Sequence, residues 1–141
     1  MSIFLLHARH NKEAFTYLND HGGFPDWTIT TAFYCAMHYC HAILFPLIEN
    51  GIEYGNVEHY YNDNKRVGDT KHGLTLRLIR QHHALIAEKY KLLKDVAHTS
   101  RYQDYNLPNV IVSKVKRNMK AIEDYCEALI ASRTLPTSTT S

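Results

Sequence analysis

The stretch from residue 26 to 44, DWTITTAFYCAMHYCHAIL, limits the folds open to this chain more than any other part of the sequence. Its apolar and aromatic side chains lie around the whole circumference of the helix that it predicts, so more than one side of that helix has to be covered. His, Thr and Cys interrupt the apolar run, and Pro46 ends it. We therefore expect a helix buried inside a globular domain, and no membrane span.

Helical patterns also dominate the flanking segments. Ser2 is an N-cap candidate for a first helix that Gly22 and Gly23 end, and the second helix is predicted to run from Asp26 to about residue 50. Residues 51–69 are rich in Gly, Asn and Asp and lack a sustained period. They predict a long, partly mobile loop.

Two more helices follow this loop. The third begins at Asp69 or Thr70 and continues as one apolar stripe that includes Leu78 and Leu85. The fourth begins near Pro108, a residue suited to a first helical turn. The predicted fold is all-α: a four-helix bundle with a long loop between its second and third helices and no significant sheet.

Length and composition set the organisation of the chain. A chain of 141 residues predicts one compact domain, residues 1–132, and the apolar-poor end predicts a flexible tail, residues 133–141. Three cysteines without paired spacing and no recognisable signal peptide favour a cytoplasmic, reducing compartment. The formal charge is only +2, so any contact with nucleic acid has to come from a local patch.

The second helix carries a second row of side chains, Tyr34, His38, His41 and Phe45, about 100° from its main apolar face. The long loop, a cofactor or a second subunit are the three candidates to cover this row. Two histidines three residues apart can share a metal, but no third or fourth ligand has a recognisable spacing. We expect no metal and no cofactor, and we expect a homodimer that uses part of this row.

Three motifs, taken in order, resemble the HEPN domains (higher eukaryote and prokaryote nucleotide-binding): AFYCAMHYCHAIL in the second helix, KHGLTLRLI at the start of the third, and SRYQDY at its end. The resemblance covers nearly the whole chain and implies a small four-helix bundle that dimerises. Its characteristic positions match Tyr34, His38, His72, Arg101, Asp104 and Tyr105. From the residues alone, Arg101 and Asp104 are better interpreted as an ion pair that closes the bundle end, with Tyr105 packed beneath it.

The resemblance implies two kinds of function. Many HEPN proteins resemble metal-independent endoribonucleases of toxin–antitoxin, antiviral defence and RNA-processing systems, with an Arg followed after four to six residues by His. Here that pattern is Arg77 and His82, although Leu78 stands where the nucleases usually carry a polar residue, and the pattern comes early in the bundle. Other members bind RNA or nucleotides without catalysis, often beside a nucleotidyltransferase partner.

The chemistry of cleavage without a metal needs a neutral His as base and a cation to steady the phosphorane. His82, with Arg77 and with His72 at the helix start, is the candidate set. On an ideal helix Arg77 and His82 lie about 140° apart, which favours the interpretation of His82 as a core-edge residue and Arg77 as a solvated one.

Basic residues supply the candidate RNA contacts. They lie on the third helix and on the fourth, and the set comprises Lys71, Arg80, Lys91, Lys94, Lys114 and Arg117. A phosphate backbone can follow such a surface, but basic residues on a helix face also serve solubility. The sequence therefore predicts an RNA- or nucleotide-associated HEPN-like protein, and it leaves open a ribonuclease or toxin and a non-catalytic binding module.

Overall fold

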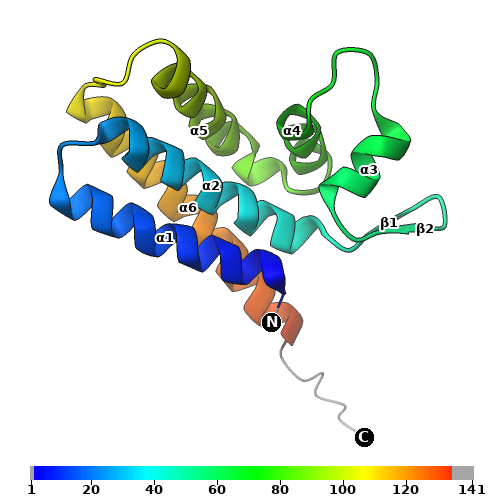
Figure 1. The fold of residues 1–141 in the computed structure, drawn as a ribbon. Coiled ribbons are helices and arrows are strands. Elements are labelled where there is room, and N and C mark those ends of the chain that lie inside the picture. The colour runs from blue at the N-terminus through cyan, green and yellow to red at the C-terminus, as the bar shows by residue number, and fades with distance from the viewer. Residues whose placement is uncertain (1, 135–141) are drawn as a thin grey trace, which may run out of the picture.

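The computed structural model describes residues 2–134, which form six helices and one two-stranded hairpin (Figure 1). The mostly helical class predicted from the sequence is confirmed. The elements are α1 (Ile3–His21), α2 (Pro25–Leu44), β1 (Leu47–Glu49), β2 (Ile52–Tyr54), α3 (Val57–Asn64), α4 (Lys71–His82), α5 (Ala84–Tyr102) and α6 (Asn109–Thr134).

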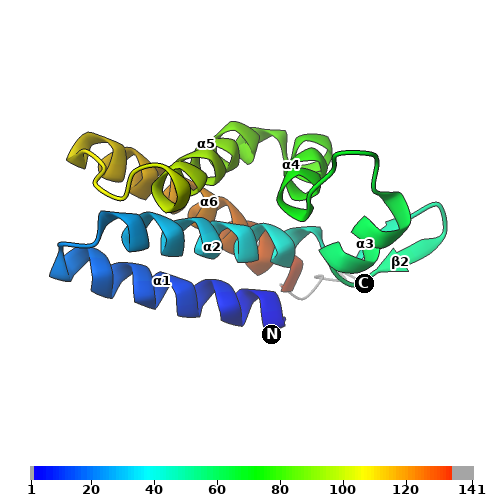
Figure 2. The same ribbon diagram turned by 45° about the horizontal axis from the view of Figure 1, so that its top comes forward.

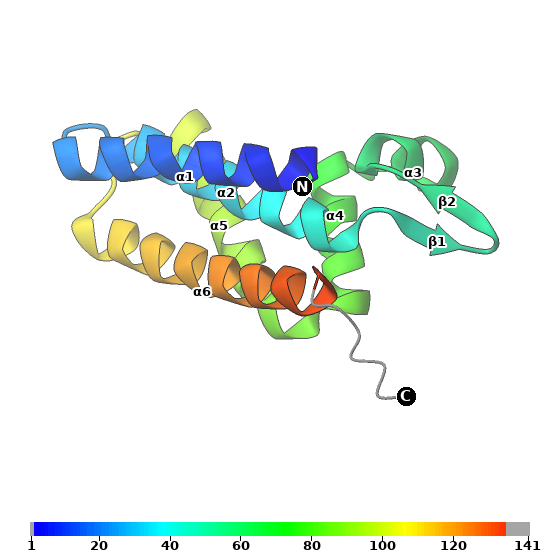
Figure 3. The same ribbon diagram turned by 90° about the horizontal axis from the view of Figure 1, so that it is seen from below.

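Helix α2 lies at the centre of the fold, as its all-round apolar pattern predicts. It packs against α1, α4, α5 and α6, and its side chains are buried around most of its circumference. One stripe of it is only half-buried, at Thr31, Tyr34, His38 and Ala42. α1 and α2 form an antiparallel pair and α5 and α6 form a second, while α4 crosses the end of α2 (Figures 1 and 3). Figure 2 shows α1 on the opposite side of α2 from α4 and α5. α2 is therefore the common neighbour of the four surrounding helices.

The predicted caps of the first and third helices are present. The Ser2 hydroxyl accepts a hydrogen bond from Leu5 N at 3.1 Å, and the Thr70 hydroxyl accepts one from Gly73 N at 3.0 Å. Gly22 ends α1 with a φ of +75°, which a residue with a side chain rarely adopts. These ends are set locally, which explains why the sequence predicts them.

The second helix is six residues shorter than predicted, and the long loop is mostly ordered structure. α2 ends at Leu44 because Phe45, which precedes Pro46, takes an extended conformation. Asn50 and Gly51 both have positive φ and join β1 to β2 in an antiparallel hairpin. Asn56 then caps α3 by accepting a hydrogen bond from His59 N at 2.8 Å. The prediction of a long loop was therefore wrong.

The predicted third helix is two helices. His83, with φ −143° and ψ 56°, ends α4 and starts α5, so the predicted stripe does not continue unchanged: Ile86 is buried but Leu85 is not. Leu78 is fully buried, whereas Leu85 is 80% exposed, and His82 is also exposed. The interpretation of His82 as a core-edge residue was wrong for this reason. At the C-terminus, residues 133 and 134 continue α6, and the rest of the predicted tail, 135–141, lies outside the described residues.

Two matched leucine substitutions test the break at His83. Leu78→Ala should lower the free energy of unfolding by about 2–5 kcal/mol, because it leaves a cavity in the core. Leu85→Ala removes the same atoms from an exposed side chain and should change that free energy by less than about 0.5 kcal/mol. Urea denaturation measures both variants. Equal losses would show that Leu85 packs in the same stripe, as an unbroken third helix requires.

Candidate functional site

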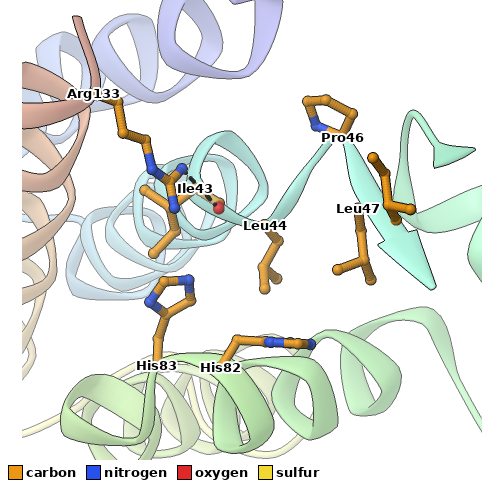
Figure 4. A pocket seen from close by; sticks show the side chains of 8 residues that line it. Ile43, Leu44, Pro46, Leu47, His82, His83 and Arg133 are labelled. Atoms are coloured by element: carbon orange, nitrogen blue, oxygen red, sulfur yellow. Dashed lines mark hydrogen bonds between the residues drawn. The ribbon is translucent and has the colours of Figure 1, made fainter. Parts of the chain in front are cut away.

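The structure does not bring the predicted catalytic pair together. Arg77 points toward the start of α4, where its Nη1 donates to the Asp69 carboxylate at 3.1 Å. His82 lies at the other end of α4 and lines a pocket of about 380 Å³ beside His83 and Arg133 (Figure 4). Within the described chain, Arg77 and His82 therefore lie in different surroundings and do not share a site.

The third predicted catalytic residue, His72, lies instead between two hollows. One has a volume of about 500 Å³ and runs between α4 and α5; we call it the His72 groove. Its lining comprises Phe33, Thr70, His72, Lys94, Asp95, His98, Thr99 and Arg101. The other hollow, of about 330 Å³, lies between α1, α2, α3 and α4; we call it the histidine pocket because His38, His41 and His72 line it.

The His72 groove is electropositive. Arg101 donates to the Tyr34 hydroxyl at 3.1 Å and lies over the rings of Tyr34 and Tyr102, so aromatic groups rather than a carboxylate hold its guanidinium. Lys94 Nζ lies 3.8 Å from Asp95, but Asp95 is also paired with Lys91 at 2.6 Å. The groove lining thus holds two cations, Lys94 and Arg101, and one carboxylate that Lys91 also binds, so the groove has a surplus of positive charge.

His72 itself is half-buried and neutral in this field. Desolvation is the largest cause that lowers the pKa of His72, and the nearby positive charges of Arg101, Lys94 and Lys71 lower it further. The edge of its ring meets Phe33 in a T-shaped contact, with 5.3 Å between ring centroids. A neutral imidazole held among cations can accept a proton or a hydrogen bond, and an anion bound beside it would favour its protonation.

The histidine pocket accounts for the second row of α2. His41 is 5% exposed, and its Nε2 lies 3.1 Å from the Thr75 hydroxyl. That hydroxyl donates to Lys71 O, so His41 Nε2–H is the donor to Thr75. His7 of α1 stacks on His38 with 5.0 Å between ring centroids. Helices α1 and α4 of the same chain therefore cover His38, His41 and Phe45, while Arg101 of α5 lies against Tyr34. Most of the row is thus covered within the chain, although Tyr34 and His38 are only half-buried.

The predicted structural group at the end of the third helix is also arranged differently. Arg101 binds Tyr34, as described above, while Asp104 accepts a hydrogen bond from Asn106 N at 2.9 Å. Tyr105 is 72% exposed and does not pack beneath them. The interpretation of Arg101 and Asp104 as a closing ion pair was wrong, because α5 ends at Tyr102 and Asp104 lies in the turn beyond it.

The predicted RNA-binding residues divide into three groups. Lys94 lines the groove, and Lys91 lies one helical turn before it on α5. Lys71 and Arg80 are engaged with the carboxylates of Glu58 and Glu88. Lys114 and Arg117 are exposed on α6, with no ion pair in the described part of the chain. His98 is the groove residue that sequence reasoning missed, although Lys94, His98 and Arg101 have the spacing of one helix face.

Between residues 2 and 134, His, Cys, Asp and Glu side chains form no group of three or more that is placed to hold a metal ion. No helix in this part of the chain is long and apolar enough to cross a bilayer.

No family model matches the sequence, and neither a curated protein nor a solved structure gives a significant match.

Burial of His41 should make the fold sensitive to mild acid. The unfolded chain takes up a proton near the ordinary pKa of 6.5, whereas desolvation, with smaller effects of His38 and His72, lowers the pKa of folded His41 to about 3. The unfolded state therefore binds more protons as the pH falls. The contribution of His41 to the free energy of unfolding is fully present above pH 6.5. It is lost as the pH falls from 6.5 to about 3, by at most about 1.4 kcal/mol per pH unit.

The variant His41→Gln tests this prediction because an amide can donate to Thr75 but does not titrate. Urea unfolding at about pH 7 and about pH 5 brackets part of the window and stays above most carboxylate titration. The wild type should lose more free energy of unfolding between the two pH values than the variant loses. Equal losses would contradict a neutral, buried His41.

Proposed function

We propose that the chain is a HEPN-like RNA- or nucleotide-associated protein that binds the phosphate backbone of single-stranded RNA in the His72 groove. The observation that carries this proposal is the Arg101 guanidinium, which aromatic rings hold beside Lys94 and His72 and which pairs with no carboxylate of residues 2–134. Fixed cations at the edge of a hollow attract phosphates, and binding releases the counterions around them. The HEPN resemblance of the sequence supports the same class of ligand.

Single-stranded RNA fits this surface better than a duplex does. Tyr102 is 71% exposed, and its ring lies 5.6 Å from the Arg101 guanidinium, so a base can stack beside the cation that holds its phosphate. The groove lies beside α5 and its C-terminal turn, next to this ring. A base can stack on Tyr102 only when it is not paired within a duplex.

The homodimer and the nucleotidyltransferase partner that the sequence predicts are proposals supported by the HEPN resemblance alone.

Matched charge removals test the groove. Lys94→Ala with Arg101→Ala should weaken the binding of a fluorescein-labelled RNA of about twelve nucleotides by at least about tenfold at moderate salt, and should reduce the salt dependence. Lys114→Ala with Arg117→Ala removes the same charge from α6 and should weaken binding less than about threefold. Fluorescence anisotropy measures both. A larger effect of the α6 pair would move the RNA site to that helix.

Metal-independent cleavage of RNA is the second candidate function, and the lowered pKa of His72 beside two cations favours it. His72 would take the proton of the 2′-hydroxyl, and the 2′-oxygen would attack phosphorus. The leaving 5′-oxygen would take a proton from His98, which lines the same groove, or from water. Lys94 and Arg101 would stabilise the charge on the phosphorane. The product is a 2′,3′-cyclic phosphate.

Cleavage of an RNA pool in EDTA separates the two candidate functions. If the protein cleaves, His72→Gln should lower the rate by at least about 100-fold while RNA affinity stays within about threefold. His10→Gln, on the exposed face of α1, is the matched control and should leave the rate unchanged. Loss of cleavage in His82→Gln with normal activity in His72→Gln would restore the Arg77 and His82 hypothesis. A wild type inert toward every RNA would leave the non-catalytic binding module.

A further inference from the structure

The pocket at the far end of α4 combines an apolar wall with a basic edge. Its volume is about 380 Å³, and it lies between the end of α2, the hairpin and the junction of α4 with α5. We call it the Arg133 pocket. Its lining comprises Ile43, Leu44, Pro46, Leu47 and Ile48 on the apolar side and His82, His83 and Arg133 on the basic side. Among the described residues that line it none is acidic, so their charge has one sign.

The basic side chains are held in place by neighbouring elements. Arg133 Nη1 donates to Ile43 O at 3.0 Å, which fixes the guanidinium of α6 against the last turn of α2 (Figure 4). His83 Nδ1 lies 2.9 Å from the Tyr125 hydroxyl, which leaves Nε2 without this partner. Figure 4 shows the His83 ring pointing toward Arg133, with the Leu44 and Leu47 side chains beside it. The positive and apolar parts are therefore adjacent and ordered.

We propose that the Arg133 pocket binds a small aliphatic monocarboxylate, with the carboxylate on Arg133 and His83 and the hydrocarbon chain on Leu44, Leu47 and Ile48. A guanidinium can pair with a carboxylate through two parallel hydrogen bonds, and among residues 2–134 Arg133 uses one Nη, which donates to Ile43 O. Ile48 is 71% exposed, so a bound chain would cover apolar surface that now faces water.

His83 supports the same ligand. Desolvation is the largest cause that lowers the pKa of His83, and Arg133 and His82 lower it further. The imidazole is therefore neutral in the free protein, and a carboxylate between His83 and Arg133 would reduce the repulsion that keeps it so. This site is independent of the His72 groove, because the two lie at opposite ends of α4.

Three probes distinguish binding of the carboxylate from binding of the hydrocarbon chain. Hexanoate carries both the charge and the chain, hexanol carries only the chain, and acetate carries only the charge. Titrations followed by two-dimensional NMR of the methyl groups of Ile43, Leu44, Leu47 and Ile48 report on the pocket. Hexanoate should bind at least about tenfold more tightly than either other probe. Equal affinities for hexanoate and hexanol, or no shifts with hexanoate, would overturn the proposal.

A matched pair of substitutions on α6 locates the carboxylate. Arg133→Gln should weaken hexanoate at least about tenfold, to the level of hexanol, whereas Arg117→Gln removes the same charge from a position on α6 that does not line the pocket and should have no effect. Arg133→Lys keeps the charge but not the paired donors and should give an intermediate affinity. Equal binding by the wild type and Arg133→Gln would overturn the proposal, and NMR spectra of each variant show directly that it is folded.

Discussion

Burial of α2 around most of its circumference is the constraint on which the rest of this structure depends. A helix whose apolar side chains point in so many directions needs several neighbours to cover it, and α1, α4, α5 and α6 provide that cover. The same constraint carries His41 into the interior, where it stays neutral and donates to Thr75 of α4. This hydrogen bond joins the crossing helix α4 to the central one, one helical turn from His72. The position of His72 beside α5 is thus a consequence of how α2 is covered.

A neutral histidine lies beside an arginine at each end of α4. At its first turn His72 faces Lys94 and Arg101 of α5, and directly after its last residue His83 lies beside Arg133 of α6. The neighbours differ in kind. Aromatic rings flank the first site, which suits a nucleotide strand, while aliphatic side chains form most of the second, which suits a hydrocarbon chain. In both, desolvation lowers the pKa of the imidazole and nearby cations lower it further, so a bound anion would favour its protonation.

Local signals in the sequence were sufficient for the helical class, the central helix and the caps at Ser2 and Thr70, because each depends on neighbouring residues alone. The hairpin was missed although Asn50 and Gly51 between two short apolar segments are a typical turn signal. The break at His83 has no such signal, since Leu85 and Ile86 continue the apolar spacing of Leu78 and Ile79. The groove depends on that break, because it sets the direction in which α5 carries Lys94 and Arg101 past His72. Sequence reasoning therefore named these three residues but assigned them to separate roles.

The most direct test of the proposed phosphate site in the His72 groove is an NMR titration of the His72 imidazole with and without a single-stranded RNA. A phosphate bound between Lys94 and Arg101 would offset the positive field and favour the protonated ring, so the pKa of His72 should rise when RNA is added. The rise should disappear in a protein that carries Lys94→Gln and Arg101→Gln. A His72 titration curve that stays unchanged at RNA concentrations that saturate binding would contradict the account, because the bound phosphate would then lie elsewhere.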